Sequence, residues 1–135
     1  MVREEVLLWI EAADEDLFDA DLAIRNKRWF RAAFYAQQAV EKLLKHYILI
    51  RKEPPPYTCR VSVLYRGVKE EGFSLPSDLE DKLSILNKYY TITRYPDAAN
   101  GLPSEAVDEE EAKRALDIAK RVLEVIKNEI YRHTK

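Results

Sequence analysis

Apolar residues recur at alternating steps of four and three along the first part of the chain, and this spacing places them on one face of a helix. The stripe consists of Val6, Ile10, Ala13, Leu17, Ala20 and Ile24. It predicts a long helix over residues 2–25. Asn26 and the basic residues Lys27 and Arg28 suit the end of that helix and a short connection.

The same spacing returns after the connection and predicts a second helix that runs antiparallel to the first. Its stripe consists of Phe30, Ala33, Gln37, Val40, Leu44 and Tyr47. This helix cannot continue past Glu53, because Pro54, Pro55 and Pro56 follow and none of them has a backbone N–H donor. An extended polyproline segment is expected there.

Two shorter helices are predicted next. Val61, Leu64 and Val68 favour a third helix that ends near Gly72, although Val61 and Val63 would also suit a brief strand. A fourth helix begins with Ser77 and Glu80, which have the spacing of a capping box. Its apolar stripe is Leu79, Leu83, Leu86 and Tyr90.

The last helix begins in the acidic run at residues 108–111, where negative charge complements the helix dipole. Its stripe consists of Ala112, Leu116, Ala119, Leu123, Ile126 and Ile130, widened by Ile118, Val122 and Val125. So broad a face belongs either deep in a bundle or in a subunit interface. Together with Trp29, Phe30 and Phe34 it exceeds what one small bundle readily buries, so the sequence predicts a homodimer.

These patterns predict an all-α fold: a mostly antiparallel, up-and-down bundle of about five helices in a single domain of residues 1–135. No apolar run approaches the roughly 20 residues that cross a bilayer, and the acidic N-terminus is unlike a signal peptide. We therefore expect no membrane association and a cytoplasmic location. One cysteine and two histidines offer no zinc-ligand spacing, so neither a metal nor a cofactor is expected.

The charge balance limits the function further. A net charge of −2 argues against a surface built entirely for nucleic acid, but it leaves room for a local basic patch. The chain has two glutamines and one methionine against 46 charged residues, a balance typical of proteins from hot environments.

The connection at residues 93–107 is, at about 15 residues, long for a compact domain, and such loops are more often functional than random. It starts with Arg94, Tyr95, Pro96 and Asp97, here called the RYPD segment. In one interpretation Pro96 ends the preceding helix and Asp97 bonds to its own turn or pairs with Arg94. In the other, the planar Arg94 guanidinium contacts a phosphate in bidentate fashion.

The second helix carries two polar groups of residues that also allow two interpretations. Lys42, Lys45 and Lys52 share one side of it beside His46, either as a solvated stripe supported by a Glu41–Lys45 pair or, with Arg94, as an anion site. Gln37 and Gln38 lie among small apolar residues. One of these amides either bonds across the bundle, with the RYPD segment as one candidate partner, or presents a donor and an acceptor to a nucleobase.

Residues 35–49, YAQQAVEKLLKHYIL, and residues 89–99, YYTITRYPDAA, resemble the HEPN domain family, and the likeness extends over residues 9–126. The resemblance implies a helical bundle that binds a nucleotide or RNA phosphate, often as a homodimer. It also implies a minimal nucleotidyltransferase as partner protein in a toxin–antitoxin pair. With the second-helix residues considered above, the candidate ligand contacts are Arg94, Tyr95, Asp97, Lys42, Lys45 and Gln38.

The chain departs from the pattern of HEPN ribonucleases, in which an Arg is followed after four to six residues by a His. The matching positions after Arg94 are Ala99, Asn100 and Gly101, and none of them can act as an acid or base. A Thr-Cys pair at Thr58 also replaces the family's frequent Thr-His. We therefore expect no catalytic residue. The alternatives are a metal-independent endoribonuclease that combines Arg94 with a histidine from elsewhere, and a pure protein-interaction scaffold.

Overall fold

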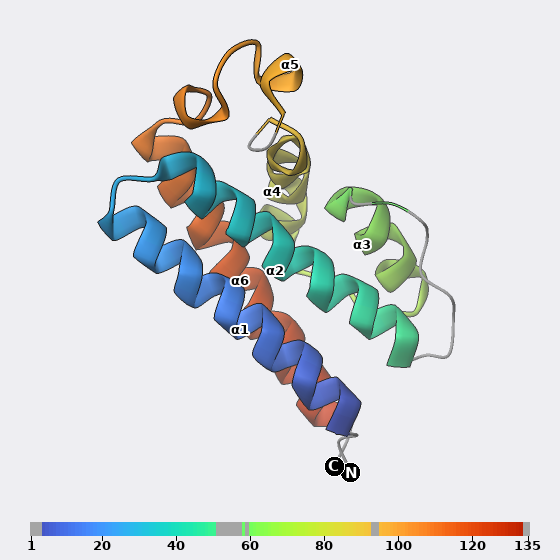
Figure 1. Cartoon of the computed structure of the whole chain (residues 1–135). Coiled ribbons are helices and arrows are strands. Elements are labelled where there is room, and N and C mark those ends of the chain that lie inside the picture. The colour runs from blue at the N-terminus through green and yellow to red at the C-terminus, as the bar shows by residue number, and fades with distance from the viewer. Residues whose placement is uncertain (1–3, 51–57, 59, 93–94, 134–135) are drawn as a thin grey trace.

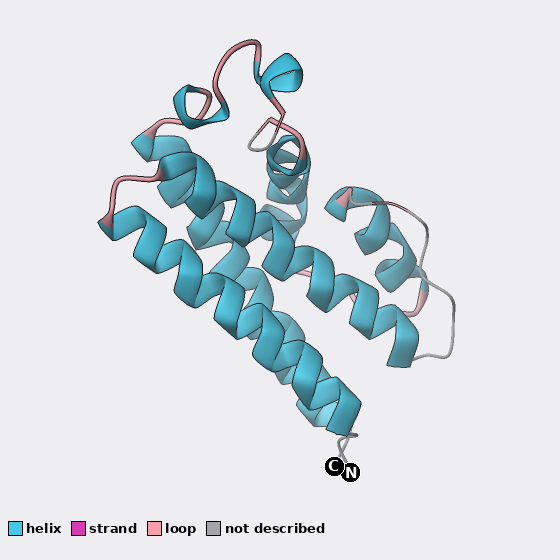
Figure 2. Cartoon of the chain, viewed as in Figure 1, coloured by secondary structure: helices cyan, strands magenta, loops and turns pink. Residues whose placement is uncertain are grey.

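The computed structural model describes residues 4–50, 58, 60–92 and 95–133, and over these ranges the protein is all-α, with helices but no strand (Figures 1 and 2). The elements are α1 (Glu4–Arg25), α2 (Trp29–Ile50), α3 (Val61–Glu70), α4 (Ser77–Asn87), the 3-10 turn η1 (Lys88–Tyr90), α5 (Pro96–Ala99), the 3-10 turn η2 (Pro103–Glu105) and α6 (Glu109–His133). The predicted all-α fold is confirmed. The proline run, Lys52, Cys59 and Arg94 lie outside the described residues.

The two predicted N-terminal helices form an antiparallel hairpin, α1 and α2 (Figure 1). α1 ends because Lys27 adopts a left-handed conformation with φ 58°. The Lys27 amide then donates to the carbonyl of Ile24 at 3.1 Å, and the Arg28 amide donates to that of Ala23 at 2.8 Å. These bonds satisfy carbonyls that a helix end otherwise leaves unpaired. The short connection is therefore set by backbone geometry.

The helix α6 packs against both helices of this hairpin and runs antiparallel to α1 (Figure 1). Its apolar stripe is buried inside the chain, including Ala112, Ala115, Leu116, Ile118, Ala119, Val122, Leu123 and Ile126. Phe30 is buried as well, and Trp29 and Phe34 are half-buried. The broad stripe therefore belongs to the core of the bundle, and the premise that it is too wide for one chain was wrong.

The segment that suited either a helix or a strand is the helix α3, and Tyr65 is one of the residues that connect it to α4. The Tyr65 hydroxyl donates to the Glu80 carboxylate at 2.6 Å and accepts from the Leu75 amide at 2.9 Å. Glu80 is thus engaged with α3, whereas the N-cap of α4 is Pro76, without a side-chain cap. The predicted capping box of Ser77 and Glu80 is therefore wrong.

A capping box does form at the start of α6. The Asp108 carboxylate accepts from the Glu111 amide at 2.8 Å, and the Glu111 carboxylate accepts from the Asp108 amide at 3.4 Å. The acidic run thus satisfies two backbone donors in addition to complementing the helix dipole.

The end of α4 also differs from the prediction. Its last buried aromatic residue is Tyr89 in η1, while the predicted Tyr90 is only half-buried. The helix has already ended before the RYPD segment, and Pro96 opens the short helix α5, where a proline at the first position costs no hydrogen bond.

None of the helices described here is long and apolar enough to span a membrane.

Candidate functional site

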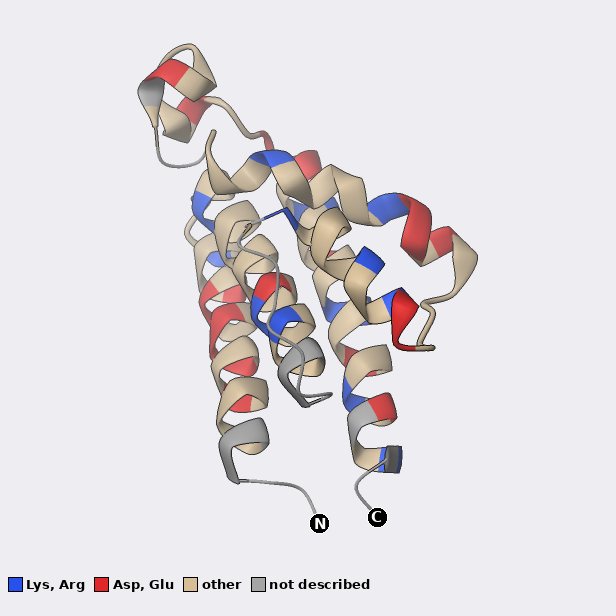
Figure 3. Cartoon of the chain, turned by 90° about the vertical axis from the view of Figure 1, so that its right-hand side faces the viewer, with Lys and Arg blue, Asp and Glu red and all other residues tan. Residues whose placement is uncertain are grey.

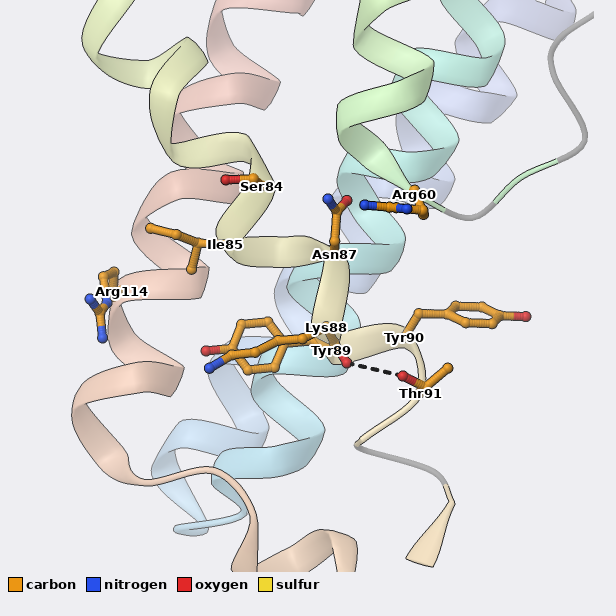
Figure 4. A pocket seen from close by; sticks show the side chains of 9 residues that line it. All are labelled: Arg60, Ser84, Ile85, Asn87, Lys88, Tyr89, Tyr90, Thr91 and Arg114. Atoms are coloured by element: carbon orange, nitrogen blue, oxygen red, sulfur yellow. Dashed lines mark hydrogen bonds between the residues drawn. The ribbon is translucent and has the colours of Figure 1, made fainter. Parts of the chain in front are cut away.

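A hollow of about 690 Å³ lies beside η1, next to the chain that leads into the RYPD segment (Figure 4). Three cationic side chains border it: Arg60, Lys88 and Arg114. Asn87, Tyr90 and Thr91 complete the part that could contact a ligand. We call this site the basic hollow.

The three cations come from three elements that are distant in sequence. Lys88 belongs to η1, Arg114 to the second turn of α6, and Arg60 directly precedes α3. Figure 4 shows Arg114 on one side of η1 and Arg60 on the other. Tyr89 is fully buried and anchors η1 against the core, so its neighbours Lys88 and Tyr90 face the hollow.

The three cations differ in how their charge is compensated. The Lys88 ammonium lies 3.3 Å from the Glu111 carboxylate, which also caps α6. Arg60 and Arg114 have no carboxylate within 4.0 Å in the part of the chain that the structure describes. Two planar guanidinium groups therefore border the hollow without a counter-ion among the described residues.

The N-terminus of α3 adds positive potential at the same place. Arg60 is its N-cap residue, provides no side-chain cap, and is followed by a first turn without an acidic residue. Asn87 accepts from the Ser62 amide at 3.3 Å and donates to the Ser62 hydroxyl at 2.8 Å, which fixes α3 against the end of α4. Arginine forks and a helix N-terminus are the groups that bind phosphate in proteins. The hollow therefore has the chemistry of an anion site.

The lysines predicted as ligand contacts lie elsewhere, on α2. Lys42 lies 2.7 Å from the Asp16 carboxylate of α1, and Lys45 lies 3.5 Å from Glu41 on its own helix. Asp16 is largely buried between the helices, and burial raises the pKa of its carboxyl despite the pairing with Lys42. The predicted Glu41–Lys45 pair is confirmed, and both lysines contribute to ion pairs rather than to the basic hollow.

The two glutamines form a chain of hydrogen bonds along α2. The side-chain amide of buried Gln37 donates to the Glu41 carboxylate at 3.3 Å. The side-chain amide of half-buried Gln38 donates to the side-chain oxygen of Gln37 at 2.7 Å. His46 is also buried, and its ring stacks on that of Trp9 with the centroids 5.7 Å apart. These polar residues therefore connect to other side chains of α1 and α2.

The RYPD segment is described only in part. Tyr95 and Asp97 are exposed at the start of α5, and Arg94 lies outside the described residues. The sequence did not point to Arg60, Asn87 or Arg114, because each is a single polar residue in or next to a different helix and no spacing connects them. Clusters of three or more metal-ligating residues are absent from the ranges described.

Comparison with known proteins agrees with this architecture. The family model for the HEPN domain matches residues 6–130. A protein of Methanocaldococcus jannaschii, named as a candidate toxin, is 27% identical over 129 residues, which cover 90% of this chain and 85% of the relative.

Two crystal structures are similar in fold and sequence. A Thermus thermophilus protein has a TM-score of 0.84 and 31% identity, with 93% of this chain and 98% of that one covered. An archaeal HEPN homologue has a TM-score of 0.75 and 30% identity, with 96% and 99% covered. The resemblance seen in the two sequence segments is therefore confirmed, and the chain belongs to the HEPN domain family.

Proposed function

We propose that this HEPN domain binds the phosphate of a nucleotide or RNA in the basic hollow and does not cleave it. The observation that carries the proposal is the pair of arginines, Arg60 and Arg114, that border the hollow without a carboxylate partner in the described part of the chain. A phosphate beside either arginine would gain charge-assisted hydrogen bonds without displacing an ion pair of the described residues. The proposed RYPD contacts, Arg94, Tyr95 and Asp97, follow Thr91 of the hollow closely in sequence.

The absence of cleavage follows from the chemistry of the available side chains. Arg94 has no histidine at the spacing found in HEPN ribonucleases. His46 is buried against Trp9 and is badly placed to exchange protons with a substrate. Losing a general acid or base typically costs about 10²- to 10⁴-fold in rate. Incubation with RNA should therefore yield no cleavage above background, and specific cleavage that Arg94→Ala abolishes would overturn this part of the proposal.

The cellular role that we propose is that of the toxin-type member of a cytoplasmic toxin–antitoxin pair, with a minimal nucleotidyltransferase as the second protein. The name of the Methanocaldococcus jannaschii relative supports the toxin-type role. A gene for a nucleotidyltransferase beside the gene for this chain, and a stable complex on co-expression, are the expected findings. A homodimer is also proposed from the family resemblance, and light scattering that gives a monomer mass at micromolar concentration would contradict it.

Titration with a fluorescent RNA oligonucleotide and with unlabelled nucleotides tests the binding site. Arg60→Gln and Arg114→Gln should each weaken binding by about 10- to 100-fold, the equivalent of one hydrogen bond to a charged group. Arg66→Gln is the matched control, because Arg66 is an exposed arginine of α3 outside the basic hollow. Equal losses in all three variants would reduce the effect to net charge and contradict the site.

The RYPD contacts are tested by Arg94→Lys, which keeps the charge and loses the planar fork. Weaker binding at an unchanged melting temperature is the expected result. The contacts Lys42, Lys45 and Gln38 remain proposed as secondary contacts, reached only if a ligand extends from the hollow towards α2. Their ion pairs and hydrogen bonds make them the weaker candidates.

A further inference from the structure

We propose that the outward face of α1 binds a helix of a second protein, and that this partner helix presents apolar anchors flanked by lysine or arginine. The α1 outer face consists of Leu8, Glu11, Glu15, Phe18 and Leu22. The inference shares with the proposed function only the expectation of a protein partner, and it does not depend on phosphate binding.

The α1 outer face has the spacing of a helix-packing seam. Its members follow one another at alternating steps of three and four, which aligns them along one side of α1. Leu8 is 60% exposed, Phe18 is 63% exposed and Leu22 is 37% exposed. The core stripe of α1 lies on the opposite side, where Ile10, Ala13, Leu17 and Ala20 are buried. α1 therefore has apolar residues on two sides, and its own bundle buries only one of them. An apolar side that stays exposed on a surface helix indicates a binding surface.

The carboxylates on this face are uncompensated. Glu11, Glu15 and the adjacent Asp19 have no cation within 4.0 Å among the described residues. Towards α6, in contrast, Asp14 pairs with Lys127 at 2.8 Å and Asp21 pairs with Lys120 at 3.1 Å. Acidic bands follow α1 along most of its length in Figure 3. The face therefore offers apolar anchors within a row of unpaired negative charges.

This charge pattern determines which partner fits. A second copy packed on this face would place two acidic patches against each other, because a two-fold interface is formed by the same patch on both subunits. Like charges across an interface oppose association, whereas opposite charges favour it and select the partner. A basic amphipathic helix satisfies both the apolar and the charged part of the α1 outer face.

A groove between α1 and α2 lies at one end of this face. It encloses about 330 Å³, and its border includes three charged residues, Asp19, Arg28 and Arg31, beside Leu22, Ala23, Asn26 and Tyr35. Leu22 thus belongs both to the exposed seam and to the wall of the groove. A polar side chain of the partner helix can enter this groove, while apolar side chains in the next turn contact Phe18.

The test uses a synthetic helical peptide with leucine at heptad positions a and d and lysine at e and g, labelled with a fluorophore. It should bind the full chain, and Phe18→Ser and the double variant Glu11→Gln with Glu15→Gln should each weaken binding at least tenfold. The matched control is Leu102→Ser, which removes an exposed leucine outside α1 and should bind as the wild type does. Circular dichroism verifies that each variant is folded.

Three results would overturn the inference: equal binding of the peptide by wild type and Phe18→Ser, equal binding of a peptide in which glutamate replaces every lysine, or conversion of a dimer to a monomer by Phe18→Ser in sedimentation velocity. The last result would assign the α1 outer face to a second copy. Nucleotide titration of Phe18→Ser separates this inference from the proposed function, because phosphate binding in the basic hollow should remain unchanged.

Discussion

The lysines of α2 and the arginines beside η1 are both basic groups on helices, but their charges are available to a ligand to very different degrees. Lys42 and Lys45 each lie next to a carboxylate, Asp16 and Glu41. Arg60 and Arg114 border a hollow and have no such partner in the described ranges. A charge that is already paired holds helices together and adds little potential for an anion, whereas an unpaired one can bind it. The partners of a cation, more than its position on a helix face, therefore indicate its role.

The largest expected effect is the loss of phosphate binding on reversing both unpaired charges. The double variant Arg60→Glu with Arg114→Glu should lower RNA affinity by more than about 100-fold, because each hydrogen bond to a charged group contributes about 1.5 to 3 kcal/mol. The slope of the logarithm of the binding constant against the logarithm of the salt concentration should decrease in magnitude by about 2, one for each lost phosphate contact. The control is Lys42→Gln with Lys45→Gln, and an equal loss of affinity in that variant would remove the distinction between the two regions.

The next largest effect concerns stability. Lys42→Gln should lower the free energy of unfolding by about 1 to 3 kcal/mol, because it leaves the largely buried Asp16 carboxylate without its cation. Urea denaturation measures this change. Combining Lys42→Gln with Asp16→Asn should recover part of the loss, and a double variant less stable than Lys42→Gln would contradict the assigned pairing.

The pH dependence of Lys42→Gln sharpens the same point. Burial raises the pKa of Asp16, so its charged form destabilises the fold at neutral pH. This cost diminishes as pH falls through the raised pKa and is gone below the ordinary value of 3.8. Acidification from neutral pH should therefore narrow the stability gap between Lys42→Gln and its double variant with Asp16→Asn. Denaturation series at stepped pH provide the measurement, and a gap that widens towards acid would contradict the sign.

The smallest effect is expected for an exposed pair. Lys69 lies 3.2 Å from Glu80 on the surface, so Lys69→Gln should leave the unfolding midpoint within experimental error. Tyr65→Phe, in contrast, removes the hydroxyl that bonds both Glu80 and the Leu75 amide and should lower the midpoint clearly. If the two variants have the same unfolding midpoint, burial does not determine which of these polar contacts stabilises the protein.

Most of the helices could be predicted from the sequence, because the spacing of apolar residues indicates which side of each helix packs against the core. The α6 stripe showed a broad packing surface but not its partner, and the partners are α1, α2 and α4 within the same chain. The capping box was misplaced for a similar reason. Glu80 has the right spacing to Ser77, but Tyr65 of another helix competes for its carboxylate.

The candidate site was less accessible to sequence reasoning. The RYPD segment, which the sequence singled out, follows the residues of the basic hollow closely along the chain. Arg60 and Arg114 could not be found, because only the fold brings the start of α3 and the second turn of α6 to the two sides of η1. Spacing along the chain also could not distinguish paired from unpaired cations, as Lys42 illustrates.

The most direct test of the binding site is a chemical-shift titration of the isotope-labelled protein with adenosine monophosphate, with inorganic phosphate as a second probe. We predict that the amide signals of Val61, Lys88, Thr91 and Arg114 shift on addition of either anion, while those of Lys42 and Lys45 remain in place. Shifts that gather at Lys42 and Lys45, or none at all at millimolar phosphate, would contradict the assignment of phosphate binding to the basic hollow.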